Sequence, residues 1–381
     1  MAKIPSLLSG MISGSLAAAC FVTSPALAGG TVEFDDGKWV SVGGGLRTNF
    51  NSVDVSRSGG FTSMADRGKD FRVESVRLYT SGKIHENIDF VFNTDAATDN
   101  DANAQNDIES LVVLDAIVQF HFSDMFNVWV GRHLPPSDRS NLSGPFFINA
   151  WNFPVVSFFP AKIAGRDDGI SVWGQRDGGK FKYQVGFYEG QENGTTADDS
   201  VLAAGRVVLN LWDPEPGYYN ASTYYGAKDI LAFGLTFQSQ ADFTGTSPNT
   251  GDFSAFNIDG LWEKKLANGA VGTVEGAYYS YGYDNVGTGD QTGYFILGSY
   301  LLAERTGLGR LQPLIRYQFL ETDGLGGNPS TEREVLDIGV NYIIDGHNAR
   351  IAFNYQTDET TVGGTTTDDA DALVVGFQLQ I

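Results

Sequence analysis

Residues 372–381 read Ala-Leu-Val-Val-Gly-Phe-Gln-Leu-Gln-Ile, and this stretch at the end of the chain decides the fold. Large apolar side chains occupy every second position, namely Leu373, Val375, Phe377, Leu379 and Ile381. The positions between them hold mostly small or polar side chains, namely Ala372, Val374, Gly376, Gln378 and Gln380. Because successive side chains of a β-strand point to opposite faces, one face suits lipid and the other a polar interior. The stretch therefore predicts a transmembrane β-strand.

The same alternation recurs from Trp39 to the end of the chain. In 311–319 and 350–356, the polar face of the pattern carries an arginine, Arg316 or Arg350. The pattern divides the chain into sixteen candidate strands, near 38–50, 71–82, 88–94, 109–122, 126–132, 166–175, 181–190, 201–212, 229–240, 253–264, 269–281, 293–304, 310–321, 333–344, 348–357 and 371–381. An even number suits a bacterial single-chain barrel. Because such an array cannot leave its edges in lipid, we expect an all-β fold, a closed transmembrane antiparallel β-barrel of about sixteen strands.

The connections between the candidate strands alternate between short and long. Short ones such as 267–269 and 345–347 contain Asn-Gly or Asp-Gly, which suit tight hairpin turns. The long ones lie near 51–70, 95–108, 133–165, 191–200, 241–252, 282–292, 322–332 and 358–370. This alternation predicts that both ends of the chain lie on the side of the short turns. The connection 213–228 breaks the pattern, because it is long for that side and contains Pro214 and Pro216.

A secreted soluble β-sandwich or β-helix would also show alternating strands. Three features favour the membrane barrel instead: long alternating runs, the regular exchange of short and long connections, and aromatic residues near many strand ends. Aromatic rings at these positions are typical of the two interfacial girdles of a membrane barrel.

The composition excludes several other classes of protein. The 381 residues carry a formal net charge of -21, which argues against nucleic acid as a partner. With 13% aromatic residues, the chain can bury too much apolar surface to stay disordered. The only apolar run of near-bilayer length lies at the N-terminus, so a helical membrane protein is excluded.

Residues 1–28 have the pattern of a cleaved secretory signal peptide. Lys3 precedes an apolar stretch, and Ala-Leu-Ala at 26–28 forms a small-x-small cleavage site. Retention as a membrane anchor and lipid attachment at Cys20 are the alternatives. Because Cys20 is the only cysteine, cleavage leaves a single barrel domain, 29–381, without disulfides or cysteine-ligated metal sites.

Three stretches resemble the family of phosphate-selective porins O and P and the wider porin superfamily. They are 77–83 (Arg-Leu-Tyr-Thr-Ser-Gly-Lys), 130–136 (Val-Gly-Arg-His-Leu-Pro-Pro) and 341–355. The resemblance implies a sixteen-stranded, trimeric, water-filled porin in the outer membrane of a Gram-negative bacterium. The resemblance does not by itself imply that this chain selects phosphate. The phosphate-selective members resemble one another in a lysine- and arginine-rich pore, and lysine is scarce here.

The connection 133–165 is far longer than most and is rich in aromatic residues. A loop this apolar must pack against something, and in porins the third loop folds into the barrel and narrows it. We expect this long third loop to fold into the lumen and form the pore constriction, with Arg132, Arg139, Arg166, Asp138, Asp167 and Asp168. The alternative is that its aromatic residues form a subunit interface while its charges are solvated.

The strand alternation assigns charges of both signs to the lumen. The basic residues are Arg47, Arg77, Lys182, Arg206, Arg316 and Arg350, and the acidic ones are Asp89, Asp115, Asp259, Glu263, Glu275 and Asp337. A lining of mixed sign orients polar solutes, whereas one dominant sign selects ions. We therefore expect weak selectivity, with arginines of the constriction favouring anions and acidic loops opposing them. Each wall arginine could equally form an ion pair with a neighbouring carboxylate.

The connection 95–108 is rich in Asp and Asn, and oxygen-rich loops of this kind can hold calcium. The weak candidate ligands are Asp99, Asp101 and Asp107, although their spacing does not match the EF-hand loop. A solvated loop and a cation bridge to lipopolysaccharide phosphates are the alternatives.

Enzymatic activity is not expected. Of the four histidines, His133 lies near Ser137, Asp138 and Ser140, but no nucleophile elbow or oxyanion motif accompanies them. A hydrolase with a site at the barrel rim remains an alternative. A barrel that sheathes a periplasmic partner such as an electron carrier is another.

The sequence thus predicts a porin, a passive diffusion channel for small hydrophilic solutes and ions that needs no cofactor. A mild preference for phosphate-like anions is left open. We expect a homotrimer in contact with outer-membrane lipid and lipopolysaccharide.

Overall fold

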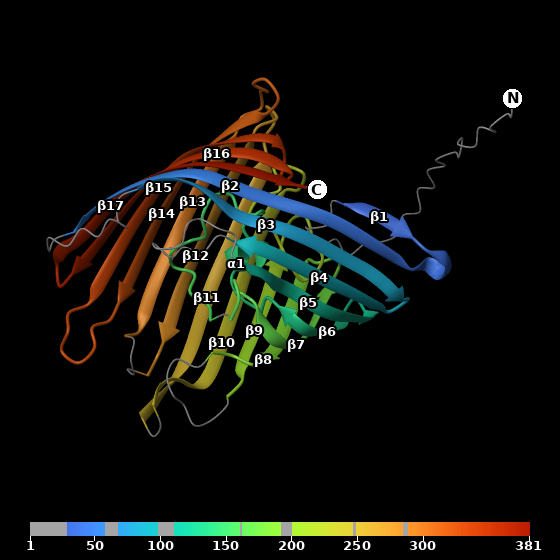
Figure 1. Ribbon diagram of the computed structural model, residues 1–381, viewed down its shortest axis with the longest axis horizontal. Coiled ribbons are helices and arrows are strands. Elements are labelled where there is room, and N and C mark those ends of the chain that lie inside the picture. The colour runs from blue at the N-terminus through green and yellow to red at the C-terminus, as the bar shows by residue number, and fades with distance from the viewer. Residues whose placement is uncertain are drawn as a thin grey trace, which may run out of the picture.

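Sixteen antiparallel strands close into a barrel (Figure 1), and one short strand extends it at the N-terminal end. The computed structural model describes residues 29–57, 68–97, 110–160, 162–191, 200–246, 249–284 and 289–381. β2 to β17 pair with their neighbours in chain order, and β17 pairs with β2 to complete the ring. The expectation of a closed sixteen-stranded antiparallel barrel is confirmed.

The strands follow the alternating segments of the sequence. They are β1 (Gly30–Glu33), β2 (Trp39–Arg57), β3 (Gly68–His85), β4 (Ile88–Ala97), β5 (Ser110–Ser123), β6 (Phe126–His133), β7 (Asp167–Arg176), β8 (Phe181–Tyr188), β9 (Leu202–Asn210), β10 (Ile230–Thr246), β11 (Asn249–Lys265), β12 (Val271–Gly282), β13 (Gln291–Leu301), β14 (Arg310–Thr322), β15 (Thr331–Asp345), β16 (Ala349–Val362) and β17 (Thr365–Gln380). Two short helices accompany them, η1 (Asp35–Gly37) and α1 (Arg139–Ser143).

No helix in the described part of the chain combines the length and the apolar composition that crossing a membrane requires. The expected signal peptide, 1–28, lies outside the described residues.

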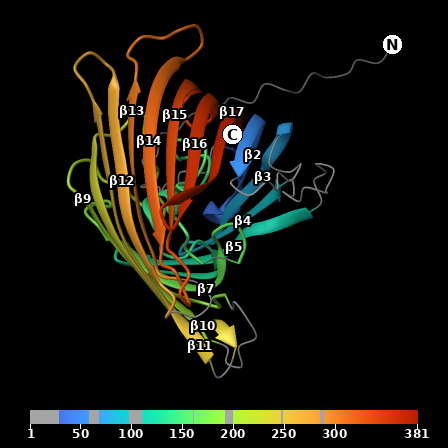
Figure 2. The same ribbon diagram turned by 90° about the vertical axis from the view of Figure 1, so that its left-hand side faces the viewer.

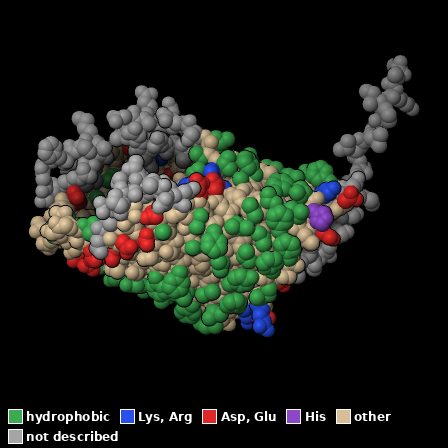
Figure 3. Space-filling view, turned by 90° about the horizontal axis from the view of Figure 1, so that it is seen from below, with side chains coloured by type: hydrophobic (Ala, Val, Ile, Leu, Met, Phe, Trp, Pro, Cys, Tyr) green, Lys and Arg blue, Asp and Glu red, His purple; other side chains and the backbone are tan. Residues whose placement is uncertain are grey.

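Each strand presents one face to the outside of the barrel and the other to the inside. In β9, for example, Val207 and Leu209 are exposed, whereas Arg206 and Val208 are buried. Figure 3 shows apolar side chains spread over the middle of one outer face, with charged groups near its ends. An apolar belt of this kind matches the hydrocarbon layer of a bilayer, and ring closure pairs the strand edges with each other.

The end of the barrel strand β17 and the start of β1 lie beside the same edge of β2. Ile381 and Gly44 exchange two backbone hydrogen bonds, at 2.8 and 2.9 Å. Gly30 of β1 lies opposite Val42, two residues before Gly44 in β2. β1 therefore continues the line of β17, and Figure 1 places it at one end of the barrel. Figure 2 shows β17 beside β2, where the ring closes.

Two expected loops are hairpins of paired strands instead. The sequence pattern predicted long connections at 241–252 and 358–370, but β10 and β11, and likewise β16 and β17, stay paired through most of these stretches. The second hairpin turns at Gly363 and Gly364, whose φ angles of 57° and 78° suit a tight turn between twisted strands. These strand ends are rich in Thr and Asp and lie beyond the apolar belt, so hydrophobic alternation carries no signal there.

Candidate functional site

The inner face of the wall carries the charged residues that the strand pattern assigned to it. Eleven of the twelve have buried or nearly buried side chains: Arg47, Arg77, Lys182, Arg206, Arg316, Arg350, Asp115, Asp259, Glu263, Glu275 and Asp337. Asp89 is half-buried. Several pair across strands, with hydrogen bonds of 2.9 Å for Arg77 and Asp95, and of 2.8 Å both for Arg206 with Asp259 and for Arg316 with Asp337. Opposite charges at this distance offset much of each other's loss of hydration.

The β6–β7 connection, residues 134–166, begins with α1. Asp138 is the N-cap of α1, and it accepts hydrogen bonds from the backbone N–H of Asn141 (3.4 Å), from the Tyr279 hydroxyl (2.7 Å) and from Ser157 Oγ (3.0 Å). Burial raises the pKa of Asp138 to about 6. Because Tyr279 belongs to β12, the cap that satisfies the first turn of α1 also fixes this helix to the wall.

Three arginines of the wall donate hydrogen bonds to backbone carbonyls of the same connection. The pairs are Arg47 with Trp151 O (2.7 Å), Arg350 with Ile148 O (2.8 Å) and Arg316 with Asn152 O (2.8 Å). The Arg47 guanidinium also lies 4.0 Å from the ring centroid of Trp151. Irregular backbone that is buried needs such partners, because no strand or helix satisfies its carbonyls. These arginines therefore hold the connection against β2, β14 and β16.

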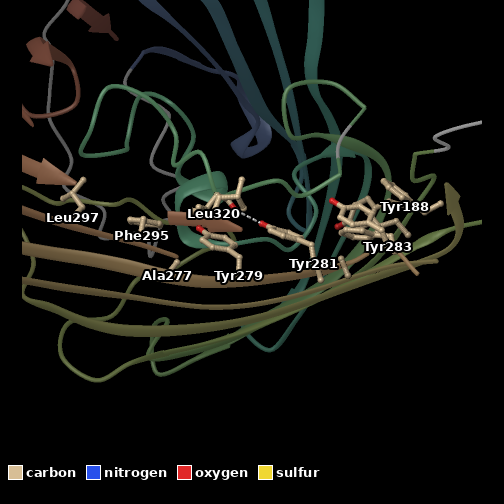
Figure 4. Close-up of a cluster of buried hydrophobic side chains, with 14 of the residues drawn as sticks. Tyr188, Ala277, Tyr279, Tyr281, Tyr283, Phe295, Leu297 and Leu320 are labelled. Atoms are coloured by element: carbon tan, nitrogen blue, oxygen red, sulfur yellow. Dashed lines mark hydrogen bonds between the residues drawn. The ribbon is translucent and has the colours of Figure 1, made fainter. Parts of the chain in front are cut away.

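Tyrosines of β12 pack against the far part of the connection. Tyr279 and Tyr281 project from the same face of β12, with ring centroids 6.0 Å apart (Figure 4). Tyr281 donates to Val156 O (3.0 Å), and its hydroxyl also accepts from Phe158 N (3.0 Å). Val156 is fully buried in this cluster. The aromatic residues of the connection thus pack against aromatic residues of the inner face.

The β9–β10 connection, residues 211–229, meets α1 from the opposite end of the barrel. Arg139 and Glu215 form two hydrogen bonds, at 2.8 and 2.6 Å, and each side chain is only 1% exposed. The Tyr224 hydroxyl donates to the same carboxylate (2.6 Å). Burial acts to raise the pKa of Glu215, but the charge and hydrogen bonds of Arg139 lower it to about 2. Glu215 therefore stays ionised as the counter-charge of Arg139.

Further polar contacts join the two connections to each other and to β12. Ser140 of α1 and Ser222 of the β9–β10 connection both donate to one oxygen of Glu275, at 3.1 and 3.0 Å. The backbone N–H of Ser222 donates to Phe147 O (3.1 Å). The two connections therefore form one packed unit on the inner face.

Beside β3, β4 and β5 the same two connections leave a cavity of about 60 Å³. Its lining includes Arg77, Asn93 and Asp115 of the wall, together with Arg166 and Tyr219 from the connections. Arg166 donates to one oxygen of Asp115 (3.2 Å), and Asn93 donates to the other (2.8 Å). At this cavity, charged wall residues border free space between the wall and the two connections.

Arg132 and Asp168 do not belong to the inner group, contrary to the expectation from the sequence. They pair with each other at 2.7 Å across β6 and β7, and Arg132 lies opposite Ala116, which is exposed. Val130 and Ile170, two residues away on the same faces, are exposed as well. Because alternate residues of a strand share a face, this ion pair lies on the outside of the barrel. Whether a strand residue points into or out of the barrel is determined by the register of its strand. Its distance along the sequence from the connection does not determine this.

The remaining expected constriction residues fall into separate groups. Asp138 and Arg139 lie at α1, and Arg166 lies at the cavity. Asp167 points inward but accepts hydrogen bonds from the backbone N–H groups of Gly190 (2.8 Å) and Asp168 (2.7 Å). Asp167 therefore holds the backbone at the end of β8 and does not face the cavity.

His133 has a different partner from those that the sequence indicated. Its Nε2 lies 2.7 Å from Ser171 Oγ and its Nδ1 lies 2.9 Å from Gly131 O, whereas Asp138 binds Tyr279. His133 and Ser171 are both fully buried. The pair is a hydrogen bond inside a packed cluster of the wall.

The calcium candidates Asp99, Asp101 and Asp107 lie outside the described residues. Within the ranges that the structure describes, no group of three or more His, Cys, Asp or Glu side chains is placed to hold a metal ion.

Glu215 and the β9–β10 connection were not identified as part of the site from the sequence. Two signals were available: the length of this connection, and its four tyrosines, namely Tyr218, Tyr219, Tyr224 and Tyr225. A connection with so many rings needs apolar surface to cover them. Tyr218 finds it on Trp129 of the inner wall, with ring centroids 4.5 Å apart.

A closed sixteen-stranded barrel with an apolar outer belt and a charged inner face is the architecture of an outer-membrane porin. The model of the family described as phosphate-selective porin O and P matches residues 40–208, which confirms the resemblance seen in the sequence. No curated protein matches the chain.

Solved porin structures share this fold at low sequence identity. An anion-selective porin from Comamonas acidovorans is 15% identical, with a TM-score of 0.59, 90% of this chain covered and 100% of that one. OmpF of Salmonella typhi, in complex with daunomycin, is 13% identical, with a TM-score of 0.55 and coverages of 91% and 99%. OmpT of Vibrio cholerae in a trimer form is 12% identical, with a TM-score of 0.55 and coverages of 90% and 99%. The fold and the family match together place this chain among the barrels of the Gram-negative outer membrane.

Proposed function

We propose that the chain is a porin, a channel for the passive diffusion of small hydrophilic solutes and ions across the outer membrane. The observation that carries this proposal is the closed ring of sixteen strands, apolar outside and lined inside by charged and polar groups. A ring of this kind offers a polar path through lipid without a cofactor or an energy source. The channel has no catalytic step.

The β6–β7 connection narrows this path. Support comes from its contacts with inner-face residues of widely separated strands, such as Arg47 of β2 and Arg316 of β14. These contacts support a connection that lies inside the ring and occupies space that solutes would otherwise cross.

Ion selectivity is weak in this proposal. The wall arginines are paired with carboxylates, as in Arg206 with Asp259, or with backbone carbonyls, as in Arg350 with Ile148. A paired charge contributes a dipole rather than a net field, so it orients polar solutes more than it selects the sign of an ion.

The assembly that we propose is a homotrimer. Support comes from the solved OmpT of Vibrio cholerae, which is described as a trimer form and shares the fold. The mass of the detergent-solubilised protein, measured by light scattering, tests this part of the proposal.

The channel itself is tested with purified protein in a planar bilayer under a KCl gradient. We expect ohmic conductance with a small zero-current potential. Deletion of 146–159 should raise the conductance if the β6–β7 connection narrows the path. A barrel that inserts but conducts no ions, or that hydrolyses lipid or peptide, would contradict the proposal.

Residues 1–28 act as the export signal in this proposal, and N-terminal sequencing of protein from outer-membrane fractions checks it. The expected first residue is Gly29. A mature chain that retains Lys3 would identify the segment as an anchor instead.

A further inference from the structure

We propose that His347 is an acid-sensitive latch, which holds the two inward connections to the β15–β16 turn near neutral pH and releases them as the pH falls. This inference rests on the proposed channel function and adds a regulation of that channel. His347 lies in the turn at 346–348, between β15 and β16, and its side chain is mostly buried. Short turns of bacterial barrels face the periplasm, so the latch responds to the periplasmic pH.

The imidazole ring of His347 contacts both connections. Its Nε2 lies 2.9 Å from Thr223 O of the β9–β10 connection, and its Nδ1 lies 3.2 Å from Phe146 O of the β6–β7 connection. The rings of Tyr225 and Phe147, one from each connection, have centroids 4.8 and 4.7 Å from that of the imidazole. One side chain of a wall turn thus joins two segments that enter the barrel from opposite ends.

The ring has two acceptors beside it but only one proton to donate when it is neutral. A neutral imidazole carries a single N–H, and its other nitrogen can only accept. Phe146 O already accepts a hydrogen bond from Gln378 Nε2 (3.0 Å), and Thr223 O is the closer of the two acceptors. The neutral ring therefore donates from Nε2 to Thr223 O, which makes His347 a wall anchor of the β9–β10 connection.

Among the groups of the described chain that face the ring, none is a carboxylate. The charged group beside it is Arg350 of β16, whose positive charge opposes protonation. The β9–β10 connection presents the Tyr225 ring, which stays neutral because burial raises its pKa, and the β6–β7 connection presents a phenyl ring and a backbone carbonyl. β17 contributes the Gln378 amide, which donates to the backbone carbonyl of His347 (2.7 Å). A protonated ring therefore has no counter-charge in this place.

The held ring and a released ring differ in pKa. Burial lowers the pKa of the held His347 to about 4 and Arg350 adds to this effect, although the two carbonyls act in the opposite direction. In water, histidine titrates near pH 6.5. Protons therefore bind the released ring first, and the held state loses its advantage as the pH falls from about 6.5 to about 4. For this pair of pKa values, the ratio of released to held molecules rises about a hundredfold between pH 7 and pH 4.

Release leaves the β9–β10 connection attached at fewer points. Thr223 O loses its hydrogen bond to the wall turn, whereas the backbone N–H of Tyr224 keeps its bond to Glu263 of β11 (3.0 Å). Glu215 also keeps its pair with Arg139. The connection therefore loosens at the short-turn end without leaving the barrel, and the path widens there.

The test is single-channel recording in KCl at pH 7 and at pH 4, with purified protein in planar bilayers. We expect two conductance levels, and the ratio of time in the higher level to time in the lower one should rise about a hundredfold from pH 7 to pH 4. His347→Gln keeps an N–H donor for Thr223 O but does not titrate, so its ratio should be the same at both pH values. His347→Lys is charged at both pH values and should favour the higher level already at pH 7.

His85→Gln is the matched control, because His85 ends β3 beside another short turn and is exposed. This variant should keep the wild-type response to pH. A wild-type ratio that does not change with pH, a wild-type response in His347→Gln, or a wild-type ratio at pH 7 in His347→Lys would overturn the latch while leaving the channel intact. Absence of any KCl current in the wild type would overturn the channel and the latch together.

Discussion

Two sectors of the inner face use the same residue types for different purposes. Around α1, the ion pair of Arg139 and Glu215 is covered by connections from both ends of the barrel and is 1% exposed. Beside β3 to β5, Arg166 and Asp115 also pair, but they border a cavity. The pair at α1 joins the two connections, whereas the pair of Arg166 and Asp115 borders free space. The comparison teaches that in this barrel the connections, rather than the wall charges, decide which role an ion pair has.

The largest expected effect comes from removing one partner of the buried pair of Arg139 and Glu215. Glu215→Ala removes the hydrogen-bonded counter-charge of the buried Arg139 and leaves Asp259, 4.0 Å away and already paired with Arg206, as a weaker one. Removing one partner of a buried pair lowers the free energy of unfolding by about 3–5 kcal/mol. Urea titration of the folded barrel in detergent, followed by tryptophan fluorescence, measures it. The matched control is Asp177→Asn, which removes the charged partner of Arg176 in an exposed pair, keeps a residue that tolerates the φ of 51° at this position, and should change nothing measurable. Equal losses in both variants would contradict the comparison.

A dependence of stability on pH follows from the same sector. The pKa of Glu215 is lowered to about 2, so its stabilising contribution is complete above about pH 4.5 and is lost as the pH falls towards 2. Asp138 acts with the opposite sign, because burial raises its pKa to about 6. Its protonation in the folded state between about pH 6 and pH 4 stabilises the protein.

Burial lowers the pKa of His347 to about 4, so this group loses stability as the pH falls from about 6.5 to 4 and offsets the gain from Asp138. The steep fall in the free energy of unfolding is therefore expected below about pH 4.5, where Glu215 titrates in the unfolded chain. Urea titrations across this range check the shape of the curve. In Glu215→Gln the steep fall on the acid side should be reduced, because the group that titrates there is gone. Wild-type and Glu215→Gln curves of the same slope below pH 4.5 would be inconsistent with the buried pair.

The access of water to the two sectors should differ sharply. Asn93→Cys places a thiol at the cavity, and a negatively charged thiosulfonate reagent should reduce the current through this variant within minutes. Ser299→Cys, a near-isosteric change in the packed part of the inner face, should resist the same reagent. The wild type serves as the background control. Comparable reaction of both cysteines would show that the packed sector is open to solution.

The smallest expected effect concerns the sign of ion selectivity. Arg166→Ala should shift the zero-current potential in a KCl gradient towards cations by a few millivolts, because it removes a positive charge beside the cavity. Arg132→Ala should leave the potential unchanged, because this arginine lies on the outer face. A shift of equal size in both variants would show that Arg132 lines the conducting path after all.

Much of the wall could be predicted from the sequence. All sixteen barrel strands match alternating segments, and the charged side chains assigned to the interior are buried or nearly buried apart from Asp89. Prediction failed where the local pattern carried no information. The polar strand ends at 241–252 and 358–370 lack apolar alternation, so they were taken for loops. Arg132 was assigned to the pore because it lies next to the connection in the sequence, whereas the strand register places it on the outer face.

The interior of the barrel was less predictable. The aromatic content of 133–165 indicated packing, but nothing local pointed to the contact of Arg139 with Glu215, which lies 76 residues away in the chain. The β9–β10 connection stood out only as too long for a turn, and its partner surface belongs to strands that are distant in sequence.

The sequence by itself determined the strands, their number and the face that each side chain takes, because pleating and lipid act on neighbouring residues of one strand. Only the tertiary structure decided which wall charges are covered by the two connections and which border the cavity. Those contacts join residues from opposite ends of the barrel. Their geometry exists only after the ring has closed, and no periodicity along the chain encodes it.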